Sequence, residues 1–533
     1  MSNLTLAYKK IIDILEKNNL LVEHNIKDSD LTKEIEFISH DSRNIVKNTL
    51  FFSKTAHSKE EYLVDAIKKG AACYVSEEKY DLKDYERNYN YIIVNNILRS
   101  IAIIAPLYYN YPYKDLNLIG ITGTKGKTTV AYFIKNILDE FTKSKTGLST
   151  NIEKYTGKRT EEASMNTPEP CDLQLYFHEA RESNIKYFTM EISSQAYKRD
   201  RVYGIKFQNG IFLNIGEDHI SPAEHKDFED YLNCKLEFLK NCSNIVINRE
   251  TDCFDRVLEA ACWIDGGTPG SSCLAKKQIT LYGSEKVKDE CDYYYSDIKK
   301  DRDKLIFYIT NNKLKYCEKF EIKMYGIFNV ENATAAVAMC KTMGIDDVSI
   351  KKGLIKTKVS GKMTVFENNG ITVIVDYAHN RLSYIKLFES IKIDYPGRKI
   401  ISVGGTPGNK AFGRRKDFAD IVGENSDYVY LTSDDPQYED TVKICEEIAG
   451  YMRGELHEII PDRVEAITKA VKSARSGDVV ALIGKGHENY QKINGKQEKY
   501  ECDLNIAQRL LSEFEEDNIN NKKTKKSREA AII

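Results

Sequence analysis

The chain has 533 residues, and a prior of about 100–200 residues per domain predicts about three or four domains. Hydrophobic residues make up 41% and charged residues 30%, which fits a globular protein and excludes a disordered or collagen-like chain. Lys and Arg (78) nearly balance Asp and Glu (80), and the net charge of −2 excludes the strong positive field of a general nucleic-acid or acidic-lipid binder.

Two apolar segments and the cysteines bear on the compartment. The most apolar stretch, residues 97–109, contains Arg99 and Pro106 and is shorter than the ~20 residues that span a bilayer. The first 21 residues carry acidic residues among their apolar positions, which predicts an amphipathic helix and not a signal peptide. The twelve cysteines form no C-x-x-C pair and no Cys/His cluster at metal spacing, so we expect a cytoplasmic protein with reduced thiols, no structural zinc and no membrane partner.

Residues 1–114 combine helical and strand patterns and predict a small α/β unit. Within it, residues 35–53 consist of short apolar runs divided by the turn-prone segments DSRN and VKN, which predicts a strand, a loop and a second strand. Residues 60–76 follow a helical pattern as far as Gly70 and then predict a strand.

A second α/β unit is predicted over residues 115–357. An apolar run from Leu116 leads into a glycine-rich turn and an amphipathic helix. Three further apolar runs predict buried strands of a parallel sheet, namely residues 186–193, 209–216 and 244–248. The alternating pattern of residues 280–325 predicts an antiparallel addition, and the Ala-rich residues 329–344 predict a helix that stops at Gly344.

A third α/β unit is predicted over residues 358–515, and the polar residues 516–533 are expected to fray. Four apolar runs end in polar or glycine residues and are each followed by a helical segment; these runs are residues 371–379, 399–405, 428–435 and 478–486. Because ligands bind at the carboxyl ends of strands in doubly wound sheets, these ends are candidate binding positions.

A candidate phosphate loop lies between a predicted strand and a predicted helix, at Gly123, Gly126, Lys127 and Thr128. Glycines let backbone N–H groups close on phosphate oxygens, and the helix N-terminus adds partial positive charge. Lys127 would neutralise the outer phosphates, and the Thr128 hydroxyl would reach Mg²⁺. Ile121 stands where the strict G-x-x-x-x-G-K-[ST] pattern has its first glycine, so the alternative is an ordinary glycine-rich turn after a strand.

The segment TGTKGKTT resembles the phosphate loop of the Mur ligases, the ATP-dependent amide-forming enzymes of bacterial cell-wall precursor synthesis. Further motifs of that family follow in the same order: SMNTPEP, MEISS, YLNCK, GKMTVFE, VDYAHN, TSDDP and GKGHENYQ. DSRNIVKNTLFF resembles the nucleotide-sugar segment of the MurE type, which adds the third amino acid. The resemblance runs from about Asp41 to Asp503.

The resemblance implies a three-domain α/β architecture. It comprises a small N-terminal α/β domain for the UDP-sugar acceptor (1–114), a central P-loop ATPase-type domain with a parallel sheet (115–357), and a C-terminal Rossmann-like α/β domain for the amino acid (358–515). It also implies that the γ-phosphoryl of ATP activates the D-Glu carboxylate of UDP-N-acetylmuramoyl-L-Ala-D-Glu as an acyl phosphate, which an incoming amine attacks. The implied partners are small molecules, and we expect a monomer that binds no nucleic acid.

Two polar residues at predicted strand ends suit a magnesium-nucleotide site. Glu191 ends one apolar run and His219 follows another. Alone, His219 could equally be an ordinary loop histidine, but the resemblance assigns both residues as metal ligands beside Thr128. Lys235, which alone would be taken for a solvated lysine, matches the lysine that the family carries as a carbamate, a group that would bind Mg²⁺ through oxygen. The expected catalytic residues are Lys127, Glu191, His219 and Lys235.

The remaining nucleotide contacts rest on the resemblance. Asn329 is expected to contact adenine and Asp376 to bind the ribose, although Asp376 alone could be a simple turn residue. His379 lies on the same loop, and Lys362 stands where the family usually has arginine, which keeps the charge but loses the planar fork. The phosphate-loop contacts are Gly123, Thr124, Lys125, Gly126, Lys127, Thr128 and Thr129.

Acceptor and amino-acid contacts are implied in the same way. Ser42 and Arg43, otherwise a surface turn, would hold the uridine end of the acceptor, with Thr167, Pro168, Ser193 and Arg201 along its length. The amino acid would be held by Arg415 (or its neighbour Arg414), Asp434, Asp435, Gln437, Gly484 and Glu488. Enzymes for meso-diaminopimelate usually carry D-N-P-R, whereas this chain has D-D-P-Q. A neutral amide beside an extra anion favours L-lysine or a related diamino acid.

Other acceptor motifs drift while the ATP-site motifs are intact; Gln195, for example, replaces the usual histidine of S-S-H-A. Two alternatives therefore stay open. One is the same amide ligation on another carboxylate, as in folylpolyglutamate or cyanophycin synthetases, and the DSRN segment argues against the folate relatives. The other is a nucleotide-binding paralogue without catalysis, which the four retained catalytic residues disfavour.

Overall fold

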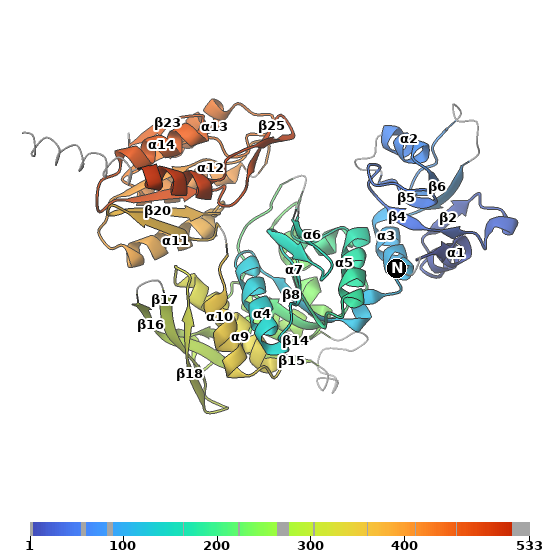
Figure 1. Cartoon of the computed structure of the whole chain (residues 1–533), viewed down its shortest axis with the longest axis horizontal. Coiled ribbons are helices and arrows are strands. Elements are labelled where there is room, and N and C mark those ends of the chain that lie inside the picture. Colours follow the sequence, from blue (N-terminus) through green and yellow to red (C-terminus); the bar gives the residue numbers. More distant parts are fainter. Residues whose placement is uncertain are drawn as a thin grey trace, which may run out of the picture.

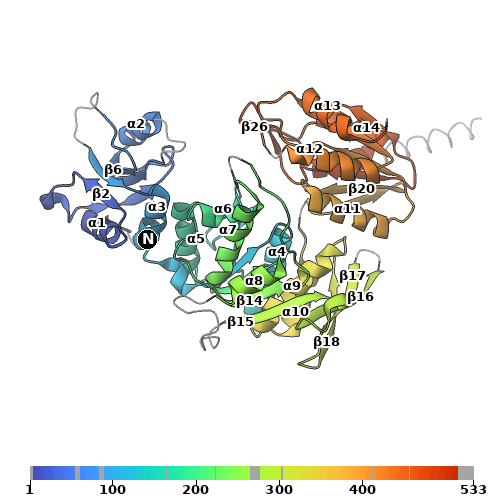
Figure 2. The same cartoon turned by 180° about the vertical axis from the view of Figure 1, so that it is seen from behind.

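The computed structural model describes residues 4–54, 60–82, 89–163, 165–221, 224–263, 277–301, 304–359, 361–410, 412–454 and 456–513. The predicted polar tail, 516–533, lies outside the described residues. Successive parts of the chain build three large sheets, each covered by helices. The unit with the central sheet lies between the other two in both views (Figures 1 and 2).

The N-terminal sheet has five strands in the order β2-β7-β6-β5-β4. Its strands are β2 (Leu21–His24), β4 (Phe37–Ser39), β5 (Thr49–Phe52), β6 (Ala71–Ser76) and β7 (Asn90–Val94), all parallel except β2. The predicted strand–loop–strand of residues 35–53 is β4 and β5. Helices α1 (Tyr8–Lys17) and α3 (Ile97–Tyr108) share one core with Leu50, whereas α2 (Glu60–Lys68) shares another with Phe51, because successive strand residues face opposite sides of the sheet.

The central sheet has eleven strands in the order β11-β10-β9-β12-β8-β13-β14-β15-β16-β17-β18. The strands from β9 to β16 in this order run parallel: β9 (Gly147–Ser149), β12 (Tyr187–Glu191), β8 (Asn117–Thr122), β13 (Phe207–Phe212), β14 (Cys242–Asn248), β15 (Gln278–Ser284) and β16 (Tyr293–Asp301). Antiparallel strands extend both edges: β10 (Glu153–Tyr155) and β11 (Thr160–Glu162), and β17 (Lys304–Asn311) and β18 (Tyr316–Ile322). The antiparallel addition predicted from residue 280 therefore begins two strands later, at β17, since β15 and β16 continue the parallel sheet.

Helices cover both faces of the central sheet. One face carries α4 (Lys127–Thr142), α9 (Phe328–Thr342) and α10 (Asp347–Lys356); the other carries α5 (Pro170–Glu182), α6 (Ser194–Lys198), α7 (Phe228–Lys240) and α8 (Phe254–Ala261). Strand β8 sends Ile119 into the first core and Leu118 into the second, which explains its continuous apolar sequence. The Ala-rich α9 is buried almost all round, and Gly344 follows it with a φ of 77°, as predicted.

The C-terminal sheet has six strands in the order β19-β20-β24-β21-β22-β23. Only β19 (Thr364–Asn368) is antiparallel; the others are β20 (Ile371–Asp376), β21 (Ile400–Gly404), β22 (Tyr428–Leu431), β23 (His457–Ile459) and β24 (Val479–Ile483). The four predicted strands are confirmed as β20, β21, β22 and β24. One core holds α11 (Arg381–Asp394), α12 (Gly413–Phe418) and α13 (Thr441–Tyr451), and the opposite core holds α14 (Arg463–Ser473).

Two small antiparallel sheets complete the fold, β1 (Leu6–Ala7) with β3 (Glu34–Ile35) and the hairpin of β25 (Tyr490–Ile493) with β26 (Lys496–Lys499). Across the described residues, no helix combines the length and the apolar character that crossing a membrane requires.

Candidate active site

A cavity of about 1020 Å³ is lined by residues of both the central and the C-terminal units. It lies at the carboxyl ends of β8, β12, β20 and β24, where side chains that follow the strands converge. Among the described residues, three polar contacts join the units here, and in one of them Asn380 Nδ2 donates to Asp218 Oδ2 at 2.5 Å. Lys125 Nζ lies 3.1 Å from His379 Nε2, and Arg414 Nη2 donates to Asp218 Oδ1 at 2.7 Å.

The phosphate loop connects β8 to α4 along the cavity wall. Gly123 and Gly126 have φ values of 150° and 89°, and a Cβ at Gly126 would clash with the side chain of Asn332, so this turn requires glycine. The first N–H groups of α4 have no partner within the helix and are available to an anion. Lys127 folds back across the loop and donates to Gly123 O at 2.8 Å.

Thr128 and Glu191 lie side by side, as a shared metal ion would require. Thr128 Oγ1 donates to Glu191 Oε1 at 2.8 Å, and the carboxylate is fully buried. Sequence reasoning missed two neighbours of this carboxylate. The Asn151 backbone N–H donates to Oε1 at 3.1 Å, and Asn166 Nδ2 donates to Oε2 at 2.7 Å. Asn151 follows β9, so its position after a strand could have identified it as a candidate site residue. Hydroxyl, amide and carboxylate oxygens form a donor set that fits Mg²⁺.

The other two predicted metal ligands lie on either side of Tyr231. His219 lines the cavity with a φ of 57°, and its Nδ1 lies 2.8 Å from Glu224 Oε1. Lys235 is behind the loop, only 2% exposed, and donates from Nζ to Gly123 O at 2.8 Å. Lys235 thus reaches the loop backbone and does not itself line the cavity.

Four lysines surround the phosphate end of the cavity: Lys235, which is buried, and Lys125, Lys127 and Lys362, which are half-buried. Burial lowers the pKa of each, and that of Lys125 falls to about 7. Repulsion from Lys127 further depresses the pKa of Lys235. Lys362 lies 4.3 Å over the ring of Tyr377. An anion bound here would relieve this crowding of positive charge.

The predicted nucleoside contacts divide into two groups. Asp376 lines the cavity and accepts a hydrogen bond from the Met363 backbone N–H at 2.6 Å, and burial raises the pKa of its carboxyl. Asn329 is instead fully buried, donating to Tyr325 O at 2.6 Å, and it does not line the cavity. The cavity wall there is formed by Glu331, which sequence reasoning missed, and burial raises the pKa of Glu331 to about 7.

Three predicted acceptor residues meet beside Glu191. Thr167 Oγ1 donates to Glu191 O at 2.9 Å and lies 3.2 Å from Ser193 Oγ, and Arg201 Nη1 donates to Thr167 O at 3.2 Å. Pro168 follows Thr167 in the same loop. The missed residue here is Glu169, which pairs with both Arg201 and Lys54.

The pair of Lys54 and Glu169, 2.6 Å apart, joins the N-terminal unit to the central unit. Although burial opposes it, the charges of Lys54 and Arg201 lower the pKa of Glu169 to about 2. Ser42 and Arg43 lie on the N-terminal unit outside the cavity lining, and the largely exposed Arg43 pairs with Asp41 at 2.8 Å.

At the other end of the cavity, Asp434, Asp435 and Glu488 surround the fully buried ammonium of Lys485. Lys485 Nζ donates to Asp435 Oδ1 at 2.9 Å and also to Glu488. Burial raises the pKa of Asp434 to about 6. Gly484, with a φ of 116°, lets the chain pass close to Asp434, where a Cβ would clash. The three carboxyl groups outnumber the lysine that they surround, and Lys410 and Arg414 also line the cavity.

Two predicted amino-acid contacts lie away from the cavity. Arg415 forms ion pairs with Glu439, at 2.7 Å, and with Glu447, whereas its neighbour Arg414 lines the cavity. Adjacent residues on a helix point in different directions, so only one of the two arginines can face the site. Gln437 is held by its backbone against the β25–β26 hairpin and is not part of the lining.

Residues 121–340 match the Mur ligase middle domain, and residues 361–486 match the domain described as Mur ligase, glutamate ligase domain. The chain is 37% identical over 521 residues to UDP-N-acetylmuramoyl-L-alanyl-D-glutamate--L-lysine ligase of Enterococcus faecalis, covering 96% of this chain and 99% of the relative. It is 38% identical over 508 residues to the ligase of the same name from Streptococcus pneumoniae, covering 94% and 99%.

The fold is also similar to that of a solved UDP-N-acetylmuramoyl-L-alanyl-D-glutamate--2,6-diaminopimelate ligase. The TM-score is 0.62 at 22% identity, covering 96% of this chain and 99% of that one.

Proposed function

The chain belongs to the Mur ligase family, and from that premise we propose that it joins L-lysine to the D-glutamate carboxylate of UDP-N-acetylmuramoyl-L-alanyl-D-glutamate at the expense of ATP. It is an ATP-dependent ligase of peptidoglycan precursor synthesis. The drift of its acceptor motifs does not favour another acceptor, because relatives that span nearly the whole chain are named for the UDP-muramoyl dipeptide.

The opposite charge of the two cavity ends carries the proposal. The phosphate end collects lysines with lowered pKa values around the N–H groups at the start of α4, which suits a triphosphate. At the far end, nothing among the described residues donates a hydrogen bond to the Asp434 carboxyl, which faces the cavity. An amino acid with a side-chain ammonium supplies the missing donor and the missing positive charge.

The reaction follows from the groups between these ends. Lys127 neutralises charge on the phosphate oxygens as the γ-phosphoryl moves to the acceptor carboxylate, and the N–H groups at the start of α4 hold the remaining phosphates. Mg²⁺, held by Thr128 and Glu191 and also by His219, would add electrostatic stabilisation of the same phosphates. The amino group of the incoming amino acid then attacks the acyl carbon, and phosphate leaves as the amide bond forms.

Lys235 is proposed to act, as a carbamate, as a further ligand of Mg²⁺. A carbamate forms when a neutral amine attacks CO₂ and loses a proton, and the pKa of the buried Lys235 is far below its ordinary value, which favours the neutral amine. Lys235→Ala should lose activity, and short-chain carboxylic acids should restore part of it by replacing the carbamate oxygens. Full activity without the acid, or no recovery with it, would contradict this role.

The three units are proposed to divide the substrates. Residues 1–114 with Ser42 and Arg43 would bind the UDP end of the acceptor, and Thr167, Ser193 and Arg201 would guide its peptide toward the phosphates. Residues 115–357 would bind ATP, and residues 358–515 would bind the amino acid. The ion pair between Lys54 and Glu169 supports this division, because it sets the first unit beside the Thr167 loop.

Phosphate release with purified protein tests the function. UDP-N-acetylmuramoyl-L-Ala-D-Glu, ATP and Mg²⁺ are combined with L-lysine, L-ornithine or meso-diaminopimelate, and omission of the acceptor is the control. We expect the highest kcat/KM with L-lysine. Phosphate release that is equal with and without the dipeptide, or no phosphate release with any of the three amino acids, would overturn the proposal.

A further inference from the structure

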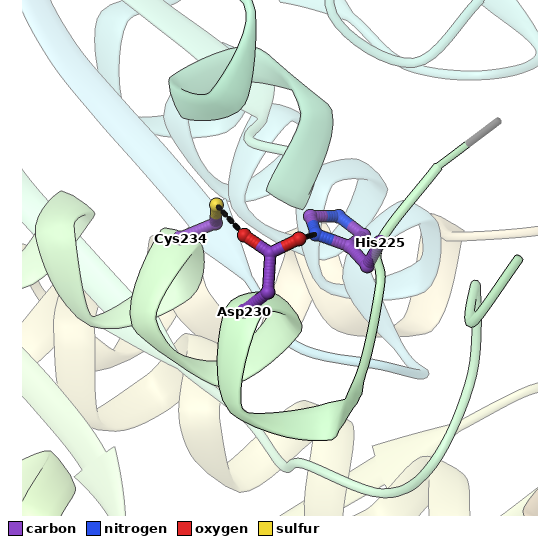
Figure 3. A group of neighbouring side chains, drawn as sticks. All are labelled: His225, Asp230 and Cys234. Carbon is purple, nitrogen blue, oxygen red and sulfur yellow. Dashed lines mark hydrogen bonds and ion pairs between the residues drawn. The ribbon is translucent and has the colours of Figure 1, made fainter. Parts of the chain in front are cut away.

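A fully buried histidine outside the cavity lining connects several elements of the proposed active site. His225 lies between the His219 loop and α7, and each of its ring nitrogens has a polar partner. Nδ1 lies 3.1 Å from Asp230 Oδ2, on the first turn of α7, and Nε2 lies 2.9 Å from Ser194 Oγ, at the start of α6. Figure 3 shows the imidazole facing the Asp230 carboxylate, and Cys234 lies on the other side of that carboxylate.

These partners select one tautomer of His225. The Asp230 carboxylate only accepts hydrogen bonds, because it already takes one from the Lys198 ammonium. His225 Nδ1 therefore carries the proton and donates it to Asp230. Nε2 is then an acceptor, and the Ser194 hydroxyl donates to it. For the neutral ring, both hydrogen bonds are satisfied in this arrangement alone, so the ring has one orientation.

Each element that His225 contacts carries a group of the proposed reaction. Ser194 follows Ser193, whose backbone N–H donates to Thr167 Oγ1 at 3.0 Å on the acceptor side. The backbone N–H of His225 donates to His219 O at 3.2 Å.

The contacts continue toward the phosphate loop through α7. The imidazole packs edge-on against Tyr231, with ring centres 5.3 Å apart. The Tyr231 hydroxyl lies 3.0 Å from Thr124 Oγ1 of the loop, and Lys235 Nζ lies 4.9 Å from the centre of the Tyr231 ring. A change in the orientation of His225 would therefore shift the positions of both Ser193 and Lys235.

A metal ion is the main competing explanation, because ligand atoms of His225, Asp230 and Cys234 lie within 4.8 Å of one another. Two observations oppose it. The Lys198 ammonium and the Lys226 backbone N–H already approach Asp230 Oδ2, so the carboxylate is neutralised without a metal. Burial raises the pKa of the Cys234 thiol to about 11, which disfavours the thiolate that a metal needs.

We propose that His225 is a positioning residue, which holds α6 and α7 in register and thereby sets Ser193 on the acceptor side relative to Lys235 and the phosphate loop. It acts on the reaction only through these neighbours. The proposal rests on the proposed ligase function for its kinetic consequence, whereas the tautomer and the coupling to Ser194 are properties of the protein without substrates.

The test compares Ser194→Ala, His225→Asn, His225→Ala and the double variant Ser194→Ala/His225→Ala, with His457→Ala in the C-terminal sheet as the matched control. His225→Ala should lower kcat on the order of 100-fold and raise the acceptor KM, with the ATP KM nearly unchanged. Asparagine can still donate to Asp230, so His225→Asn should recover part of the rate. The double variant should be no worse than His225→Ala, because the two side chains act through one hydrogen bond.

A second readout needs no substrate. Nitrogen-15 NMR of labelled histidines should report a protonated Nδ1 and an unprotonated Nε2 for His225, and a mixture of tautomers in Ser194→Ala. An Nε2-protonated ring would overturn the proposal even if His225→Ala failed to fold, and additive kinetic losses in a folded double variant would also overturn it. Micromolar zinc binding that disappears in Cys234→Ala would also overturn it, in favour of a metal site. If the wild-type protein shows no ligase activity but gives the expected NMR result, only the proposed function is contradicted.

Discussion

The two ends of the cavity differ in sign. At the phosphate end, lysines gather around a glycine-rich turn, and burial lowers the pKa of Lys125 to about 7. At the amino-acid end, carboxyl groups surround Lys485, and burial raises the pKa of Asp434 to about 6. Both shifts disfavour the charged form, and a bound ligand of opposite sign would stabilise the charged form at each end. One end is suited to a triphosphate and the other to an ammonium.

The two ends also differ in construction. The phosphate end is built mainly from the backbone of a single turn between β8 and α4. The conformation of that backbone should therefore change little when a neighbouring side chain is substituted. The amino-acid end is assembled from side chains after β22 and β24, held together by Lys485. We therefore expect substitutions at the first end to reduce catalysis and substitutions at the second end to change selectivity.

The largest effect is expected at Lys127. Lys127→Ala removes the charge that neutralises the transferring phosphoryl group, and kcat/KM should fall about 10³-fold in a phosphate-release assay. Lys143→Ala, at the exposed far end of α4, is the matched control and should retain wild-type activity. A loss of less than tenfold at Lys127 would mean that the loop N–H groups suffice without it.

The adjacent arginines test which side chain serves the amino-acid end. Arg414→Ala removes a charged donor from the cavity, and the amino-acid KM should rise on the order of 10–100-fold. Arg415→Ala should leave that KM unchanged and lower the melting temperature, because it breaks ion pairs with Glu439 and Glu447. Steady-state kinetics and thermal unfolding of both variants distinguish the roles. A raised amino-acid KM in Arg415→Ala with an unchanged KM in Arg414→Ala would mean that Arg415 contacts the amino acid.

Selectivity at the carboxylate end is tested with norleucine, which has the carbon chain of lysine without its ammonium. Asp434→Asn removes one negative charge with little change of shape, so the KM for L-lysine should rise about tenfold while the KM for norleucine stays the same or falls. Glu446→Gln, exposed on α13, removes a surface charge as the control. Equal changes for both amino acids would show that Asp434 does not contact the ammonium.

The smallest effect is a pH dependence. The raised pKa of Asp434, about 6, means that the carboxyl becomes neutral as the pH falls through 6 in the free enzyme. Attraction for the substrate ammonium is then lost, so kcat/KM for L-lysine should fall by up to about tenfold per pH unit below that value. Asp434→Asn should flatten this limb of the profile between pH 5 and 7. An unchanged profile in the variant would assign the limb to another group.

Local patterns predicted most of the fold. Both faces of β8, β12 and β20 are covered, so most of their residues are apolar and these segments could be recognised as buried strands from the sequence. The strand–turn–helix of the phosphate loop is similarly local, and Thr128 and Glu191 lie together because β8 and β12 are adjacent and parallel. The sequence missed that β15 is parallel, since alternation does not reveal strand direction.

The amino-acid sequence by itself determined the loop, the strands and the family resemblance, because each depends on residues close together in the chain or on motifs in fixed order. The tertiary structure alone decided that Arg414 faces the cavity while Arg415 does not, and that Glu331 replaces Asn329 in its wall. It also paired Lys54 with Glu169, 115 positions away. These outcomes depend on how helices are rotated against the sheets and on how the units pack. The packing energy is a sum over contacts between residues that are distant in sequence, so local patterns do not predict it.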